Sequence, residues 1–318
     1  MKIKFNKYRF AEWFFIISFI FLSIENIAQE ITIVETQRIK LNLNKELYFP
    51  HFSSDDSKIL FSTSNYKGLY YYELETGKTK TITEGFGAGY KPLILSDEFI
   101  VIFKTDIYDK GRKYGSIHSF NFATEQKQTL ELNKRRVVLP DQVNSNSIKY
   151  LLNSELKQFM LENKLEKSNM PERAVYVEDD RLFLIEGNEV DDISPFGSGP
   201  YVWESISNDG NKILFTFGNQ GTYLIDFEGE VLLNIPKAHY PKLSPNGKFI
   251  LYMKDEDDGN QYTGSDIFIY SIENEESYSI TSTEDKIEMF AEWSHKGDQI
   301  VYHTLEGEIF LIKLKIGE

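Results

Sequence analysis

Short apolar runs alternate with polar turns along most of the chain, and one such pattern recurs. Its clearest copy is PKLSPNGKFILYM (241–253), in which a polar turn with Gly precedes an apolar run that contains an aromatic residue. Three more copies align with it without gaps: PHFSSDDSKILFS (50–62), WESISNDGNKILFTF (203–217) and AEWSHKGDQIVYH (291–303). Because Asn-Gly and Asp-Gly suit the positive φ angles of tight turns, each copy predicts a β-hairpin.

The pattern has two weaker copies, and most copies are followed by further strands, so the repeating unit has four strands. The weaker copies are PLILSDEFIVIF (92–103) and LPDQVNSNSIKYLL (139–152), and most copies are followed by two further alternating runs. The aromatic residue that ends the hairpin recurs roughly every 40 to 50 residues, which is the period of a β-propeller blade. We therefore expect an all-β fold, a six-bladed β-propeller of four-stranded antiparallel blades.

The limits of the domain are inferred from the two ends of the repeat array and from one long interval between copies. The last copy is one strand short, and EITIVETQRIKLNL (30–43) has strand-like alternation, so an N-terminal strand is expected to close the ring. The interval between the third and fourth copies is long, and we interpret about 153–174 as an irregular insertion. A short helix and the remains of a seventh blade are the alternatives. Residues 30–318 are thus expected to form a single propeller domain.

The first 28 residues have the composition of a signal peptide. Four basic residues precede an apolar run from Trp13 to Leu22, and a small residue, Ala28, follows. The run is shorter than the ~20 residues that a membrane-spanning helix needs. A cleaved signal peptide at 1–28 predicts a periplasmic or secreted bacterial protein without stable membrane insertion, and an uncleaved anchor is the alternative.

The repeat resembles the WD-like repeats of the TolB family of β-propellers. The resemblance rests on Pro-x-x-Ser-Pro-Asn-Gly-Lys (241–248), the apolar run with Tyr252, the later Gly-Ser-Asp-Ile-Phe (264–268) and the closing Ile-Thr (280–281). It implies a propeller in the cell envelope that binds other macromolecules. The span before the first copy is too short for the additional N-terminal domain of TolB itself.

Charge and cysteine content narrow the function. The formal net charge is −14, with 49 acidic and 35 basic residues, so nucleic acid is not expected as a partner. The chain has no cysteine, which excludes disulfides and thiol chemistry. The sequence indicates no cofactor and no metal, because the histidines are scattered and the acidic run at 255–258 does not fit an EF-hand loop.

Candidate binding residues come from the loops, where propellers carry their sites. Two aromatic and Gly-containing loops and one acidic loop are expected on the same face. The candidates are Phe86, Tyr90, Phe196, Tyr201, Asp255, Asp257, Asp258 and Tyr262. Packing between blades is the alternative for the aromatic residues, and a solvated surface loop is the alternative for the acidic ones.

The sequence thus favours an exported, non-enzymatic binding or scaffold propeller. One loop face would recognise a protein or glycan partner in the cell envelope. The alternative is a propeller enzyme, such as a metal-dependent lyase or a glycan hydrolase, with its site at the mouth of the channel. Convergence of polar side chains at the channel would favour the enzyme.

Overall fold

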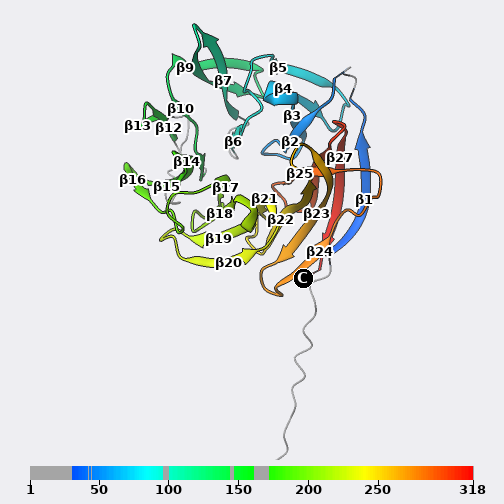
Figure 1. Ribbon diagram of the computed structural model, residues 1–318. Helices are drawn as coiled ribbons and strands as arrows, with labels where there is room; N and C mark the ends of the chain where they lie inside the picture. Colours follow the sequence, from blue (N-terminus) through cyan, green and yellow to red (C-terminus); the bar gives the residue numbers. More distant parts are fainter. Residues whose placement is uncertain are drawn as a thin grey trace, which may run out of the picture.

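The strands form a ring of antiparallel sheets around a central channel (Figure 1). The structure is a computed structural model that describes residues 31–41, 43, 45–95, 100–143, 147–160 and 172–317. The expected signal peptide at 1–28 lies outside the described residues. No helix in the described part of the chain has the length and apolar character needed to cross a membrane.

The described residues contain seven sheets, here called blades 1 to 7 in chain order. Blades 1 and 2 are formed by β2 (Tyr48–Phe52), β3 (Lys58–Thr63), β4 (Lys67–Glu73), β5 (Thr79–Thr83), β6 (Leu93–Leu95), β7 (Ile100–Asp109), β8 (Arg112–Asn121) and β9 (Gln126–Lys134). Blade 3 is formed by β10 (Val137–Val138), β12 (Ser147–Leu152) and β13 (Glu155–Met160). Blade 4 is formed by β11 (Asp141–Gln142), β14 (Arg173–Glu178), β15 (Arg181–Glu186) and β16 (Glu189–Asp192).

Blades 5 and 6 follow the same four-strand order, and blade 7 recruits the first described strand. Blade 5 is formed by β17 (Tyr201–Ile206), β18 (Lys212–Phe217), β19 (Thr222–Asp226) and β20 (Val231–Ile235), and blade 6 by β21 (His239–Leu243), β22 (Phe249–Asp257), β23 (Tyr262–Ser271) and β24 (Glu276–Ser279). Blade 7 is formed by β25 (Glu288–Trp293), β26 (Gln299–Thr304), β27 (Ile309–Ile316) and β1 (Ile31–Ile39). Two short 3₁₀ turns, η1 (Ser64–Tyr66) and η2 (Gly218–Gln220), link the second and third strands of blades 1 and 5.

The prediction of six blades is wrong. The long interval contains blade 4, which the hairpin pattern could not detect because its first strand, β11, is separated in sequence from its second, β14. The blade 3 hairpin β12–β13 lies between them. Part of the expected insertion at 153–174 is therefore strand, since β13 covers Glu155–Met160 and β14 begins at Arg173, while residues 161–171 lie outside the described residues.

A side-chain amide joins blades 3 and 4 where the chain passes from one to the other. The amide of Gln142 donates to the carbonyl of Lys149 (3.1 Å) and accepts from its N–H (3.0 Å). It thus takes the place of a strand neighbour for β12. The Nζ of Lys149 is buried and donates to the carbonyl of Gly187, 2.5 Å away, in blade 4.

The repeated hairpin has a shared hydrogen-bonding pattern that explains its sequence. In four copies the Ser hydroxyl accepts the N–H five residues later, at 2.9–3.0 Å; these residues are Ser53, Ser207, Ser244 and Ser294. Positive φ is confined there to one residue per turn: Asp56, Gly210, Gly247 and Gly297. Glycine, as the sequence indicated, adopts the left-handed conformation in three copies and Asp56 adopts it in the fourth, and in each turn a single residue rather than a pair does so.

The ring is closed as the sequence predicted. β1 pairs with β27 along its length and becomes the outermost strand of blade 7 (Figure 1). A second link joins blades 7 and 1, because the carboxylate of Asp56 accepts hydrogen bonds from the backbone N–H groups of His295 (2.7 Å) and Lys296 (3.1 Å).

The two faces of the ring are distinguished by their loops. The described connections between blades and the turns between second and third strands lie on one face, here called the loop face. The turns between first and second strands lie on the opposite face, here called the turn face. The innermost strand of each blade runs from the loop face to the turn face and lines the channel.

Candidate functional site

The innermost strands of four blades share a β-bulge that places an aromatic residue at the channel. In blades 1, 5, 6 and 7 the register with the second strand shifts by one residue near the loop face. The bulged positions hold Phe49, Trp203, Tyr240 and Phe290. Their φ angles are 54°, 55°, 51° and 52°, a left-handed conformation that bulky residues rarely adopt.

Such backbone conformations carry strain. Each typically costs about 1–3 kcal/mol and persists where the surrounding structure holds it, often at functional sites. The same bulge occurs at the equivalent position of four blades, which indicates that it is a regular structural feature of the channel wall.

The four bulged residues contact one another across the channel. Ring centroids of Phe49 and Phe290 are 5.0 Å apart, those of Phe290 and Tyr240 are 4.8 Å apart, and those of Tyr240 and Trp203 are 6.0 Å apart. The contacts continue through Tyr66, which stacks on Phe49 at 4.1 Å and touches Tyr90 at 5.1 Å. These six residues are here called the aromatic layer.

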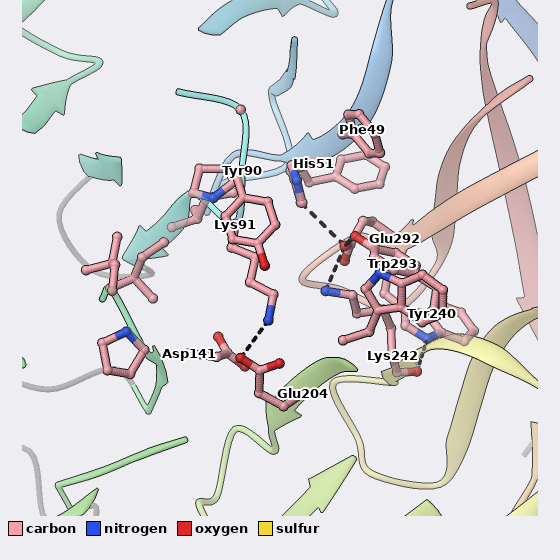
Figure 2. A pocket seen from close by; sticks show the side chains of 18 of the residues that line it. Phe49, His51, Tyr90, Lys91, Asp141, Glu204, Tyr240, Lys242, Glu292 and Trp293 are labelled. Carbon is pink, nitrogen blue, oxygen red and sulfur yellow. Dashed lines mark hydrogen bonds and ion pairs between the residues drawn. The ribbon is translucent and has the colours of Figure 1, made fainter. Parts of the chain in front are cut away.

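A charged cluster lies two residues further along the same strands, towards the turn face (Figure 2). Glu292 accepts a 2.6 Å hydrogen bond from the hydroxyl of Tyr240 and forms a 2.9 Å ion pair with Lys242. The Nδ1 of His51 lies 3.4 Å from the same carboxylate. The indole N–H of Trp293 donates to the carbonyl of Lys242 at 3.2 Å, which fixes the strand that carries the lysine.

The cluster changes the proton affinities of its members. Burial raises the pKa of Glu292, but Lys242, His51 and the hydroxyl of Tyr240 outweigh burial, and the net pKa is lowered. Burial lowers the pKa of His51 to about 4, so its imidazole is neutral at pH 7. Burial and the nearby Glu292 raise the pKa of Tyr240 well above its usual value. At neutral pH the cluster therefore contains an ionised carboxylate, a neutral imidazole and a neutral phenol.

The opposite wall of the cavity carries a second carboxyl group, Asp141, whose pKa is displaced in the opposite direction (Figure 2). Burial raises the pKa of Asp141, with Glu204 adding to the effect and Lys242 and Lys91 opposing it. One carboxylate oxygen of Asp141 accepts the N–H of Ile206 at 2.9 Å. Glu204 itself is paired with Lys91 at 2.7 Å, an ion pair that joins the loop before blade 2 to the first strand of blade 5.

These groups line one cavity of about 250 Å³ inside the channel. Its walls combine the aromatic layer except Phe290, the charged cluster and Asp141 with Leu139 and Pro140. A cavity that combines aromatic walls with convergent polar groups of perturbed pKa is typical of a ligand site. Two carboxyl groups whose pKa values are displaced in opposite directions are the arrangement that acid–base catalysis uses.

A second hollow, of about 400 Å³, lies on the loop face. It contains three of the residues that the sequence suggested, Asp255, Asp257 and Tyr262. Asp255 is paired with His239, whose Nδ1 is 2.6 Å from its carboxylate. Trp203 lines both this hollow and the channel cavity.

The other suggested residues are dispersed. Tyr90 belongs to the aromatic layer and lines the channel cavity. Phe196 and Tyr201 both contact the ring of Phe217; Tyr201 is buried, whereas Phe196 is 39% exposed. Asp258 accepts the N–H groups of Asn260 and Gln261 and so stabilises its own turn, while Phe86 is exposed beside Lys67. Ligand binding by any of these residues stays a prediction.

The charged cluster is absent from the site that the sequence predicted, although the repeat contained a signal for it. Three residues before the hairpin Ser stand Pro50, Glu204, Pro241 and Ala291, and two before it stand His51, Ser205, Lys242 and Glu292. A polar position that changes between copies inside otherwise apolar strands is what a site lined by several blades would produce. The bulge that turns these side chains to the channel is not visible in the pattern.

Among the residues that the structure describes, no group of three or more His, Asp or Glu side chains is placed to hold a metal ion.

The fold and the cavity together define a seven-bladed β-propeller with a ligand-sized pocket in its channel. No protein-family model matches the chain, and no curated protein matches it. Among solved structures the chain is similar to an oligogalacturonate lyase from Vibrio parahaemolyticus, with 11% identity, a TM-score of 0.51, and coverage of 85% of this chain and 78% of that one. It is also similar to a streptogramin B lyase, with 14% identity, a TM-score of 0.58, and coverage of 88% and 98%. These similarities show the propeller fold, and the resemblance to the TolB family stays a prediction.

Proposed function

We propose that this chain is a propeller enzyme that cleaves a glycosidic bond in its channel cavity by acid–base catalysis. The observation that carries the proposal is the pair of carboxyl groups, Asp141 and Glu292, with oppositely displaced pKa values in one cavity. Glycoside hydrolysis commonly uses one protonated and one ionised carboxyl group on either side of the bond.

The roles follow from the two environments. Asp141 is the carboxyl group whose protonated form burial favours, so it would be the proton donor to the leaving oxygen. Glu292, kept ionised by Lys242, would take a proton from the attacking water or stabilise the positive charge at the anomeric carbon. The products gain the elements of water, and the two carboxyl groups return to their starting states by proton exchange with solvent.

The lining fits a sugar of little net charge. Both lysines of the cavity are already paired, Lys242 with Glu292 and Lys91 with Glu204, so neither is free to bind an anionic substrate. Aromatic rings such as Trp203 and Tyr240 offer surfaces on which a sugar ring packs. The two solved structures named above are lyases, so the propeller fold accommodates catalysis, while the reaction class proposed for this chain comes from its side chains.

The experiment is a screen of neutral plant and bacterial oligosaccharides for release of new reducing ends. The wild type is compared with Asp141→Asn and Glu292→Gln, and with the matched surface variants Asp285→Asn and Glu276→Gln. We expect at least a hundredfold loss of rate in the first pair and wild-type rates in the second. Equal rates in all five proteins, or no hydrolysis and no saccharide binding by the wild type, would reject the proposal.

The second candidate is the binding of a protein or glycan partner at the loop face, as the sequence suggested. The hollow lined by Asp255, Asp257 and Tyr262 favours it. This function predicts a partner whose capture from envelope extract is lost in Asp255→Asn and kept in Glu292→Gln.

A further inference from the structure

We propose that the channel cavity is a blind pocket, entered from the turn face, that receives the terminal unit of a linear saccharide chain. The saccharide part of this proposal rests on the proposed function, whereas the direction of entry rests on geometry alone. The loop face, where the sequence placed the site, would be the closed end.

Two features close the loop-face end of the cavity. The aromatic layer spans the first strands of blades 5, 6, 7 and 1, with successive ring centroids 4.1–6.0 Å apart. The remaining side is crossed by the 2.7 Å ion pair between Lys91 and Glu204. The side chain of Glu204 is only 10% exposed. The aromatic rings and the ion pair together separate the charged cluster from the loop face.

Among the described residues, the turn-face end is bordered by exposed polar side chains. Asn208 and His295, in the turns that follow β17 and β25, line the cavity there. An adjoining hollow of about 130 Å³ lies between blades 5 and 6 and shares Asp141, Asn208 and Lys242 with the cavity. The cavity therefore continues past the catalytic pair towards the turn face.

The size and shape of this space set what it can hold. A volume of about 250 Å³ lies near the lower limit of small-molecule sites, roughly 300–1,000 Å³. A closed inner end leaves no exit for a chain that threads through. The cavity would accept one terminal unit, and the next unit would lie in the adjoining hollow, with the bond between them near Asp141.

The direction of entry can be measured without any substrate, because the chain has no cysteine. A single reporter, His51→Cys, is labelled with a small maleimide. Bulky plugs are added at matched exposed asparagines of blade 5: Asn208→Trp on the turn face and Asn219→Trp on the loop face. We expect the turn-face plug to slow labelling at least tenfold and the loop-face plug to change it less than twofold.

Slower labelling with the loop-face plug alone, or equal slowing by both, would overturn the proposal. If the reporter protein does not fold, Ile94→Cys, on the innermost strand of blade 2, replaces it and gives the same two outcomes. Circular dichroism of each plugged protein checks that it is folded, so that a change in labelling rate reports access to the reporter cysteine.

The chain-end specificity is tested with a linear oligosaccharide that the wild type cleaves or binds, compared with the same chain blocked at each end. We expect one blocked end to abolish binding and the first product to be a single small sugar. A ladder of products would overturn the blind pocket while leaving the proposed hydrolysis intact. Turn-face labelling without any saccharide binding would reject the proposed function and its chain-end specificity while confirming the direction of entry.

Discussion

Two arcs of the ring differ in how they build the channel. Blades 5, 6, 7 and 1, here the regular arc, have the Ser-containing hairpin turn, the bulge and the aromatic residue with positive φ. Blades 2, 3 and 4, here the irregular arc, pair their innermost strands without a register shift, and no described residue of β6, β10 or β11 has a positive φ. The bulge with its left-handed aromatic residue is thus confined to one arc, while the positive φ angles next to β6 and β10 lie outside the strands, at Lys91 and Arg136.

The two arcs supply different parts of the site. The regular arc supplies the aromatic layer and the Glu292 cluster, which are held by contacts between neighbouring blades. The irregular arc supplies Asp141 and, from the loop before β6, Lys91. The two carboxyl groups differ because the partners of Glu292 outweigh the effect of burial on its pKa, whereas burial outweighs the partners of Asp141.

The largest expected effect is the loss of packing in the aromatic layer. Phe290 is 9% exposed and contacts three other aromatic rings of the layer, so Phe290→Ala should lower the free energy of unfolding by about 3 kcal/mol. Ile94→Ala in the irregular arc should cost about 1–2 kcal/mol, because Ile94 is only partly buried. Urea unfolding of both proteins measures the difference. Equal losses would contradict the special role of the layer.

The two carboxyl groups should respond to neutralisation in opposite directions. Glu292→Gln leaves Lys242 without its partner and should destabilise by about 2 kcal/mol at pH 7. Asp141 has a raised pKa, so its contribution to stability is present below the ordinary pKa and is lost as the pH rises through the raised value. Asp141→Asn should therefore be neutral or stabilising at pH 7. Destabilisation of the same size by both variants in urea unfolding would contradict the assignment.

Two buried histidines of the regular arc should dominate the pH dependence between about 6.5 and 4. Burial lowers the pKa of His51 and of His303 to about 4, so both are neutral when folded and take up protons on unfolding. Their stabilising effect is full above the unfolded pKa of about 6.5 and is lost as the pH falls towards 4. His51→Gln should remove about one proton from this dependence, or about 1.4 kcal/mol per pH unit. Urea midpoints from pH 7 to 4 measure the slope, and an unchanged slope would show that His51 is protonated in the folded state.

The smallest expected effect concerns the link that closes the ring. Burial raises the pKa of Asp56, but hydrogen bonds from His295 and from the N–H of Lys296 outweigh it, and the net pKa is lowered. Its stabilisation is present above the unfolded pKa and is lost as the pH falls through the lowered value. Asp56→Asn should cost about 1 kcal/mol at pH 7, and the cost should shrink below pH 4. Thermal unfolding at both pH values is the check, with Asp285→Asn as the control, and a cost independent of pH would indicate that the charge has no part in closure.

The regular arc and blade 2 were predictable, whereas blades 3 and 4 were not. The weak copy at 92–103 forms the expected pair of β6 and β7, but the weak copy at 139–152 is not a hairpin, because β11 pairs with β14 and β12 pairs with β10 and β13. The hairpin copies ending at Phe61, Phe215, Tyr252 and Tyr302 were located because each Ser, turn and aromatic lies within one continuous segment. Blade 4 was hidden because β11 pairs with β14 across the inserted hairpin β12–β13, and no local pattern records such pairing. The number of blades was underestimated for that reason.

The candidate site was only partly predictable. Tyr90 lines the channel cavity, and Asp255, Asp257 and Tyr262 surround the loop-face hollow. His51, Lys242 and Glu292 were not proposed, because they lie on strands, whereas binding residues were expected in loops. Their meeting depends on bulges and on blade order, which are properties of the closed ring.

Saccharide binding by three proteins distinguishes a channel site from a loop-face site. The wild type, Glu292→Gln and Asp255→Asn are titrated by ligand-observed NMR with the neutral oligosaccharide that gives the strongest signal in the screen. We predict that binding weakens at least tenfold in Glu292→Gln, on the channel wall, and is unchanged in Asp255→Asn, on the loop face. Loss of binding in Asp255→Asn with full binding in Glu292→Gln would contradict the channel site and place the binding site on the loop face.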